Sequence, residues 1–487
     1  MTSKKTNIIA KKFNLNNKNF SKIFFILITL VIVLYINHSI FKIFIQALPF
    51  IIFIPLFFIC IRPRKKKETL ESQSIMQKRI KRFKSIKRGY YSLIILILLY
   101  LISLITPLWI NNKPLMLAYA NEKWDEGEEF IDTNSNNLFD IGEEFVDETD
   151  YYFPALWNFL DFVPGINYPV YEAKNFNQNT TSIEVDFRLL NKTLVSEDSK
   201  NYVIMPFYPY HPHEDLKDQL DEEYTDSNKN GKWDEGEDFV DSNMNEKWDE
   251  INPPTLPDGL SGRHILGTDN TGRDVFARMC YAFNISISFA FVITVLNYII
   301  GISIGGAMGY FGGKFDLFFQ RLIEVWASLP LLFVVIILSS ILIPSFSLLI
   351  FIYTLVHWIF LTYYMRAEFY REKAKDYVSA AISMGQSTPN IIFRHILPNS
   401  LVPVITYFPF SIVGGIVALI SLDFLGFGLP PPTPSWGQIL YVGLSNITKW
   451  WMVFSPIMAQ FFTLLCIVFI GEAVREAFDP KIYSRLR

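Results

Sequence analysis

The stretch that decides the fold runs from residue 283 to residue 309 and reads FNISISFAFVITVLNYIIGISIGGAMG. It has no charged side chain, and it is longer than the roughly 20 apolar residues that a helix needs to cross the hydrocarbon core of a bilayer. The sequence therefore predicts a membrane-spanning helix here.

Similar apolar runs recur along the chain, in which 51% of the 487 residues are hydrophobic. Such a composition argues against an ordinary soluble protein, and the three cysteines support neither a disulfide framework nor a cysteine metal site. The pattern predicts an all-α polytopic membrane protein with about eight membrane helices. They are expected near residues 23–38, 41–61, 90–110, 283–309, 325–343, 347–365, 402–421 and 452–472.

The first apolar run follows a lysine-rich start, which is also typical of a signal peptide. No small-residue cleavage site follows it, and a second apolar run begins almost at once. These features favour a retained membrane hairpin over residues 1–61.

Charge sets the expected orientation. Residues 62–89 hold twelve Lys and Arg against two Glu, and the positive-inside rule makes this linker cytoplasmic. Spans on both sides hold it beside anionic lipid of the bilayer, so a role in binding nucleic acid is disfavoured. Counting spans onward places residues 111–282 and 422–451 outside. The loop 366–401, the tail 476–487 and both termini then lie in the cytoplasm.

The inner loop is too polar to stay in lipid. Its helical stretches are broken at Gly385 and Pro389 and are expected to end at Pro398, which predicts a helix, a turn and a helix. A rigid polar element of this kind can carry motion from a soluble motor to membrane helices. The chain has no G-x-x-x-x-G-K-[ST] phosphate loop and no catalytic constellation, so we expect a permease that is not an enzyme, with ATP hydrolysed by a partner.

Residues 376–399, DYVSAAISMGQSTPNIIFRHILPN, resemble the EAA coupling loop of binding-protein-dependent ABC importers. In that family two alanines, a glycine and a downstream Leu-Pro mark the surface that docks on the ATPase. The resemblance implies a coupling role for the matching positions, although a serine stands where the family usually has glutamate. These positions are Ser379, Ala380, Ala381, Gly385, Leu397 and Pro398.

Four further blocks, in order, are similar to the dipeptide and oligopeptide permeases: GTDNTGRD at 267–274, SLDFLGFG at 421–428, SWG at 435–437 and GEAVREAFDP at 471–480. Each alone could be a capping turn or a helix exit; together they are specific. Shorter pieces at 87–93, 112–119 and 151–156 resemble the Yej-type member of this family.

The resemblance implies a permease core at 283–475, with a first family-type helix at 90–110, that imports peptides across the bacterial cytoplasmic (inner) membrane. It implies a second permease subunit, cytoplasmic ATP-binding subunits and an extracytoplasmic peptide-binding protein as partners, and no cofactor in the core. Two alternatives stay open. One is an ABC permease for another solute such as nickel, and the other is a membrane-anchored calcium-sensing receptor or adhesin.

Two acidic stretches, 121–150 and 214–250, share a repeat in which an aromatic residue precedes an aspartate. Both contain the oxygen-ligand spacing of an EF-hand loop, and we expect Ca²⁺ to bind there in bare loops. A solvated acidic linker is the alternative. The first loop offers Asp132, Asn134, Asn136, Asp140 and Glu143, and the second offers Asp226, Asn228, Asn230, Asp234 and Glu237.

Histidines provide the remaining candidates. His211 and His213 form an H-P-H pair that lacks a third zinc ligand at suitable spacing. His264 and His395 are expected at a surface or an interface. His357 lies in a predicted span and is expected to face a cavity, because ionisable groups within the membrane seldom face lipid.

Overall fold

The computed structural model describes residues 75–120, 150–160, 173–176, 185–196, 201–214, 264–342 and 344–479, together with positions 169, 171 and 257. The predicted hairpin at 1–61 lies outside the described residues. The ten predicted calcium ligands lie outside them as well.

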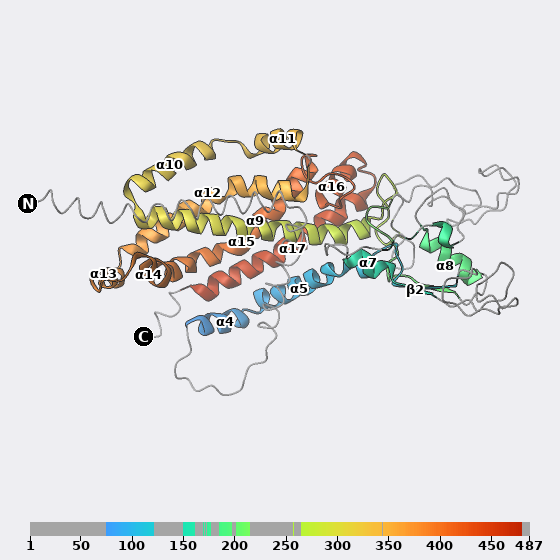
Figure 1. Cartoon of the computed structure of the whole chain (residues 1–487), viewed down its shortest axis with the longest axis horizontal. Helices are drawn as coiled ribbons and strands as arrows, with labels where there is room; N and C mark the ends of the chain where they lie inside the picture. The colour runs from blue at the N-terminus through green and yellow to red at the C-terminus, as the bar shows by residue number, and fades with distance from the viewer. Residues whose placement is uncertain are drawn as a thin grey trace, which may run out of the picture.

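Long apolar helices lying side by side make up the body of the protein (Figure 1). Within the described part of the chain, five are long and apolar enough to cross a membrane. They confirm the helices expected near 90–110, 283–309, 347–365, 402–421 and 452–472, with shifted ends. They are α5 (Lys87–Leu104), α9 (Val275–Phe311), α12 (Phe346–Lys373), α15 (Leu397–Phe424) and α17 (Trp450–Phe478).

The prediction of one continuous helix at 325–343 is wrong. The chain there forms α10 (Gly313–Ala327) and α11 (Leu331–Ile341), which are bent by 73° relative to each other. Pro330 precedes α11 with extended backbone, at ψ 119°. Proline disfavours helical backbone in the residue before it, so the helix stops at Ala327. With 11 residues, α11 is about 16 Å long, which is roughly half the hydrocarbon thickness.

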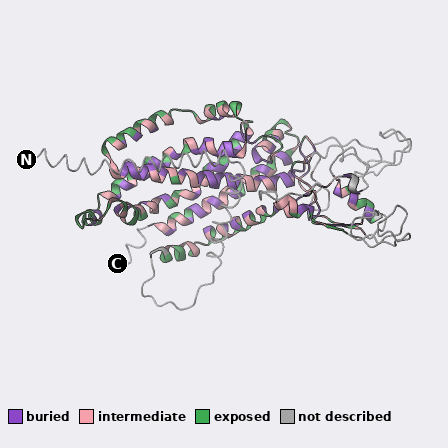
Figure 2. Cartoon of the chain, in the orientation of Figure 1, coloured by how far each residue is buried: buried purple, intermediate pink, exposed green. Residues whose placement is uncertain are grey.

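Glycines let α9 and α12 approach closely. A Cβ on Gly305 would lie 2.3 Å from the carbonyl oxygen of Thr362, and one on Gly309 would lie 2.5 Å from Cβ of Phe369. Small residues four apart are typical of tightly packed membrane helices, where packing replaces the hydrophobic effect as the driving force. The burial pattern agrees, because α9 is largely buried whereas few residues of α10 and α11 are buried (Figure 2).

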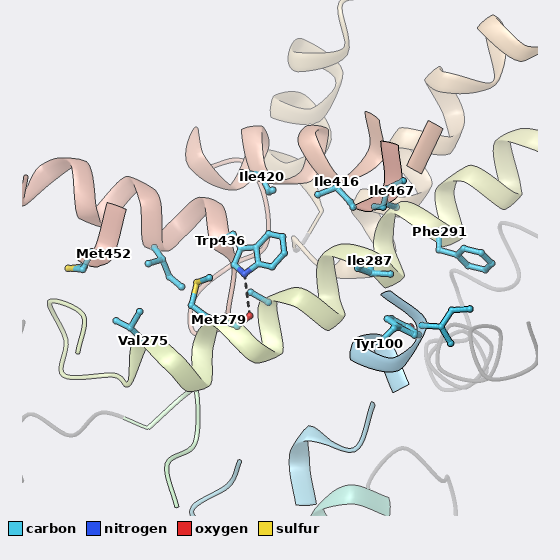
Figure 3. Packing of buried hydrophobic residues seen from close by; sticks show 14 of the residues in the cluster. Tyr100, Val275, Met279, Ile287, Phe291, Ile416, Ile420, Trp436, Met452 and Ile467 are labelled. Carbon is cyan, nitrogen blue, oxygen red and sulfur yellow. Dashed lines mark hydrogen bonds between the residues drawn. The ribbon is translucent and has the colours of Figure 1, made fainter. Parts of the chain in front are cut away.

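A short helix, α16 (Trp436–Ser445), packs against α9, α15 and α17 at one end of the bundle. Its Trp436 side chain is buried among Ile416, Ile420 and residues of α9, and its Nε1 donates to the carbonyl of Met279 over 3.2 Å (Figure 3). Ser435 caps α16 by accepting from the amide of Gly437. The SWG block is therefore a cap followed by an anchoring tryptophan.

The segment before α9 contains a small sheet with antiparallel strands in the order β2-β1-β3. Its strands are β1 (Met116–Tyr119), β2 (Asp150–Tyr152) and β3 (Tyr202–Ile204). The sheet, the 3-10 helix η1 (Ala173–Phe176) and α8 (Phe187–Ser196) enclose a cluster rich in aromatic side chains. Two further short helices, α6 (Thr106–Trp109) and α7 (Pro154–Leu160), contact each other, and α7 also contacts β1.

Asp274 joins this small domain to the bundle. One carboxylate oxygen caps α9 by accepting from Ala277, and the other accepts from the hydroxyl of Tyr208 over 2.6 Å. His264 Nδ1 lies 2.8 Å from the same oxygen, and only 4% of His264 is exposed. Of the two positions expected for His264, a surface or an interface, the structure shows an interface, where hydrogen bonding to Asp274 allows the imidazole to be buried.

At the opposite end of the bundle, α4 (Ile75–Ser85) precedes α5 and lies against the end of α17. Arg82 forms an ion pair of 2.6 Å with Glu476, and the Arg79 guanidinium lies over the ring of Phe478. Part of the basic linker is thus a helix in contact with the last membrane helix.

The candidate coupling hairpin and the membrane cavity

The predicted coupling loop forms a helical hairpin whose first arm is α13 (Asp376–Ser383). The amide of Gln386 donates to the carbonyl of Ala381, and that of Gly385 donates to Ile382. This is the Schellman motif, which ends a helix on a residue in the left-handed region. Gly385 has φ +75°, so glycine is required there by backbone conformation.

The second arm begins with Pro389 in the first turn of α14 (Thr388–Asn390), a position that suits proline. It continues as the π-helical segment η4 (Ile391–Ile396) directly into α15. The expectation that helix ends at Pro398 is therefore wrong. Proline removes a donor and crowds the carbonyl four residues earlier, and the wider π turn just before Pro398 suits a helix that continues through it.

Hydrogen bonds hold the two arms together and fix them to the membrane helices. Oε1 of Gln386 accepts from Asn390 over 2.9 Å and lies 2.7 Å from Nε2 of His395. The Tyr377 hydroxyl donates to Glu372, at the end of α12, and accepts from Asn399, near the start of α15. The hairpin can therefore move as one body with α12 and α15.

The six coupling residues expected from the sequence divide into two groups. Ser379, Ala380, Gly385 and Pro398 are exposed on the hairpin. By contrast, Ala381 is buried in an apolar cluster, and the partly buried Leu397 packs against the same cluster. The first group can contact a partner, while the second supports the hairpin from within.

Three exposed apolar side chains were missed by the sequence reasoning. Ile382, Met384 and Phe393 are 53%, 71% and 68% exposed on the same hairpin. Grouped apolar side chains on a polar loop are typical of an interaction surface. These residues could have been noticed in the sequence as apolar side chains in an otherwise polar loop. They do not belong to the apolar cluster that packs between the two arms.

An ion pair extends this rigid unit to the broken helix. Arg366 of α12 donates from Nε and Nη2 to the two carboxylate oxygens of Asp316 in α10, over 2.6 and 2.7 Å. Tyr370 donates to the same carboxylate over 2.9 Å. Bidentate pairing fixes direction as well as distance, so α10 is tied to the helix that carries the hairpin.

A cavity of about 250 Å³ lies between α9, α12 and α15, within the span region. His357 lines it, which confirms that this histidine faces a cavity. The same walls carry the polar side chains of Asn297, Thr294, Tyr298 and Ser411. Polar side chains at this depth are costly unless they serve a function or face water.

His211 and His213 stack edge to face with ring centroids 5.0 Å apart. No group of three His, Cys, Asp or Glu side chains suited to a metal ion occurs in the described part of the chain. A zinc site at this pair has no third ligand there.

A bundle of apolar helices with a polar hairpin at one end and a polar cavity inside defines a membrane transport component. The family model described as "Binding-protein-dependent transport system inner membrane component" matches residues 301–483. The chain belongs to this family of ABC permease subunits, which are membrane components and not catalytic enzymes, and it is a multi-pass membrane protein. The family expected from the coupling loop is thus confirmed.

Individual relatives extend the match. The "Peptidoglycan transport system permease protein YejE" of Agrobacterium fabrum is 33% identical over 405 residues, covering 83% of this chain and 93% of the relative. The "Inner membrane ABC transporter permease protein YejE" of Escherichia coli is 43% identical over 226 residues, covering 46% and 66%. The "Dipeptide transport system permease protein DppC" of Bacillus subtilis is 34% identical over 224 residues, covering 46% and 70%.

Proposed function

We propose that this chain is the transmembrane permease subunit of an ATP-driven importer that moves peptides or peptide-like compounds across the cytoplasmic membrane. The observation that carries the proposal is the hairpin 376–399. It is joined by hydrogen bonds to the ends of α12 and α15, and these two helices wall the cavity. Peptide cargo is supported by the names of the relatives, two of which refer to dipeptide and peptidoglycan transport.

In this proposal a cytoplasmic ATPase docks on Ser379, Ala380, Gly385 and Pro398, together with Ile382, Met384 and Phe393. Closure of the ATPase displaces the hairpin, and α12 and α15 follow because they share its hydrogen bonds. The Asp316–Arg366 pair passes the displacement on to α10. A second permease completes the path, and an external binding protein delivers the peptide.

The proposed orientation puts the hairpin and both termini in the cytoplasm and residues 111–282 outside. The hairpin helices α13 and α14 lie at one end of the bundle, and α8 with the sheet lies at the other end, which supports this arrangement (Figure 1). The proposed domain limits remain those expected from the sequence: an N-terminal membrane hairpin at 1–61, a linker at 62–89, the first family-type helix at 90–110, an outer domain at 111–282, the core at 283–475 and the tail at 476–487. Calcium binding in the acidic repeats stays a prediction.

The test compares two glycine variants that carry the same backbone strain. Gly385 and Gly426 have φ +75° and +80°, and a Cβ at either position meets nothing within 4 Å. Gly385→Asp lies on the hairpin, whereas Gly426→Asp lies beyond the other end of α15. We expect Gly385→Asp to abolish peptide uptake and co-purification of the ATPase, with the protein still in the membrane.

Gly426→Asp is expected to retain ATPase binding. The coupling assignment is rejected if Gly385→Asp transports peptide and binds the ATPase like the wild type. Peptide cargo itself is rejected if the wild-type complex, reconstituted with its binding protein, takes up no labelled peptide.

A further inference from the structure

Asn297 lies in the middle of α9 and lines the cavity between α9, α12 and α15. Only 8% of the residue is exposed, and its Oδ1 has no hydrogen-bond partner among the described residues. A buried amide oxygen without a donor costs free energy that the fold does not recover elsewhere. The position therefore calls for a ligand that brings an N–H or O–H group.

The exposed part of the cavity lining lies on α12 and α15 and includes an ionisable side chain. His357 and Gly414 both line the cavity and are exposed there, and Phe360 beside them is 66% exposed. An imidazole in a membrane helix is expected to face protein or a water-filled path. A Cβ on Gly414 would meet nothing within 4 Å, so the glycine leaves the α15 backbone open to an incoming chain.

The wall beside Asn297 carries further hydrogen-bonding groups. The hydroxyls of Tyr298 in α9 and Ser411 in α15 lie 3.2 Å apart. Their hydrogens also have backbone acceptors, the carbonyl of Val404 for Tyr298 and that of Tyr407 for Ser411. The hydroxyl oxygens can still accept, so the wall suits a ligand that brings N–H groups, as a peptide main chain does. Tyr353 of α12 also lines the cavity and contributes an aromatic ring.

The size of the cavity indicates that it is incomplete in one chain. Its 250 Å³ falls just below the roughly 300–1,000 Å³ of pockets that enclose a small ligand. It is nevertheless large enough for several waters, at about 30 Å³ each. A second surface opposite Phe360 and Gly414 would close it.

We propose that this cavity is one half of a peptide-binding site in the translocation path, in which Oδ1 of Asn297 accepts a main-chain N–H of the cargo. This inference rests on the proposed function. Two of the three helices around the cavity continue into the coupling hairpin. Movement of the hairpin would therefore change the spacing of the walls and release the peptide.

The first test replaces Asn297 with leucine, which keeps the size and removes the acceptor. The matched control is Asn284→Leu in the same helix, outside the cavity, where the amide donates to the Ser103 hydroxyl over 3.0 Å. Uptake of a labelled tripeptide is measured in proteoliposomes with the whole importer and its binding protein. We expect Asn297→Leu to lower uptake at low peptide concentration two- to tenfold, which corresponds to one lost hydrogen bond, and Asn284→Leu to stay within twofold of wild type.

A second arm removes the donor from the cargo instead. Tripeptides N-methylated at one amide are compared with the parent, restricted to pairs that the binding protein holds with equal affinity. When the methyl group replaces the N–H that contacts Asn297, the wild type should take up the methylated peptide less well than the parent. The Asn297→Leu variant should take up both peptides equally, because methylation and the substitution each remove the same hydrogen bond. Equal losses in both proteins for every methylated peptide contradict the assignment.

A third arm locates the peptide directly. A benzophenone amino acid placed at Phe360 is expected to cross-link labelled peptide during turnover, whereas the same group at Phe461, exposed on α17, is not. Uptake unchanged in Asn297→Leu, with cross-links from Phe360 only to the second permease or to lipid, overturns the proposal while peptide import stands. Absence of peptide uptake in the wild type overturns both.

Discussion

Arg366 and Asp316 form a bidentate ion pair between the hairpin-bearing helix α12 and the broken helix α10. Two parallel hydrogen bonds of 2.6 and 2.7 Å join them, and the Asp316 side chain is almost fully buried. Because the pair is bidentate and shielded, it differs from an exposed ion pair, whose contribution to stability is near zero. The pair fixes how α10 follows α12.

Replacing Asp316 with asparagine is therefore expected to lower the free energy of unfolding by about 1–3 kcal/mol, because the half-buried Arg366 guanidinium loses its charge partner. Uptake is expected to fall more than ATP hydrolysis, since the hairpin still docks while α10 no longer follows. The measurements are thermal unfolding in detergent and the ratio of peptide moved to ATP hydrolysed. Arg321→Gln is the control, because its pair with Glu324 is exposed. An equal effect of the two substitutions would refute the special role of the buried pair.

Phe393 offers a test of the docking surface that leaves the fold intact. Its side chain is 68% exposed, so Phe393→Ser removes little packing within the chain. We expect ATPase affinity to fall at least fivefold, as for an aromatic contact near the centre of an interface. Ile447→Ser, at an exposed site in the loop before α17, is the matched control. Unaltered binding of the ATPase to Phe393→Ser would place the docking surface elsewhere.

Gly305 tests the packing of α9 on α12. An alanine there would place Cβ 2.3 Å from the Thr362 carbonyl oxygen, so the helices must separate. We expect a loss of about 1–3 kcal/mol from overpacking, despite the better helix propensity of alanine. Gly414→Ala, where the added methyl meets nothing, should keep or raise the melting temperature. A melting temperature unchanged in Gly305→Ala would show that the two helices are less tightly packed than the structure indicates.

The fold and the site were predictable where the signal is local. Long apolar runs predicted the five long helices, and Gly385 predicted the turn of the hairpin because only a left-handed residue closes a Schellman motif there. The break before Pro330 was readable in principle, but the apolar composition on both sides outweighed a single proline. The π turn before Pro398 has no local signature of that kind.

Features that depend on distant residues were not predictable. β1 pairs with β2 and β3 across long, polar intervening segments, as in Leu117 with Tyr152 and Ala118 with Tyr202. The burial of His264 depends on Asp274 and Tyr208, and only the fold brings these three together. Asn297 resembles any polar residue in a span until the cavity around it is known.

The acidic repeats are predicted from their sequence to bind Ca²⁺. If the loops beginning at Asp132 and Asp226 bind Ca²⁺, terbium should bind the purified chain and emit after excitation of Trp233, which lies inside the second loop. Affinity in the range of about 10⁻⁴–10⁻³ M is expected for extracellular sites of this type. Asp226→Ala should remove the tryptophan-sensitised emission, whereas Asp241→Ala, which lies in the same acidic stretch but outside the ten predicted ligands, should not. Equal emission from both variants would favour a solvated acidic linker.

His211 provides a pH-dependent prediction for the outer domain. Burial, with a smaller effect from His213 and Lys113, lowers its pKa to about 4. The folded domain therefore keeps the imidazole neutral at pH values where the unfolded chain, with a pKa near 6.5, takes up a proton. The resulting stability is present above pH 6.5 and is lost as the pH falls towards 4. Burial raises the pKa of Glu214, and this acts in the opposite direction because protonation of Glu214 then favours folding.

The comparison of wild type with His211→Gln isolates the histidine, since Glu214 is common to both. Between pH 7 and pH 4.5 we expect the melting temperature of the wild type to fall more steeply than that of the variant. The melting temperature is followed by near-ultraviolet circular dichroism. Hydrogen exchange of residues 201–214 then reports on the outer domain separately from the membrane helices. Parallel pH profiles for the two proteins would mean that His211 is accessible enough to be protonated in the folded state, and that its packing against Tyr281 does not exclude water.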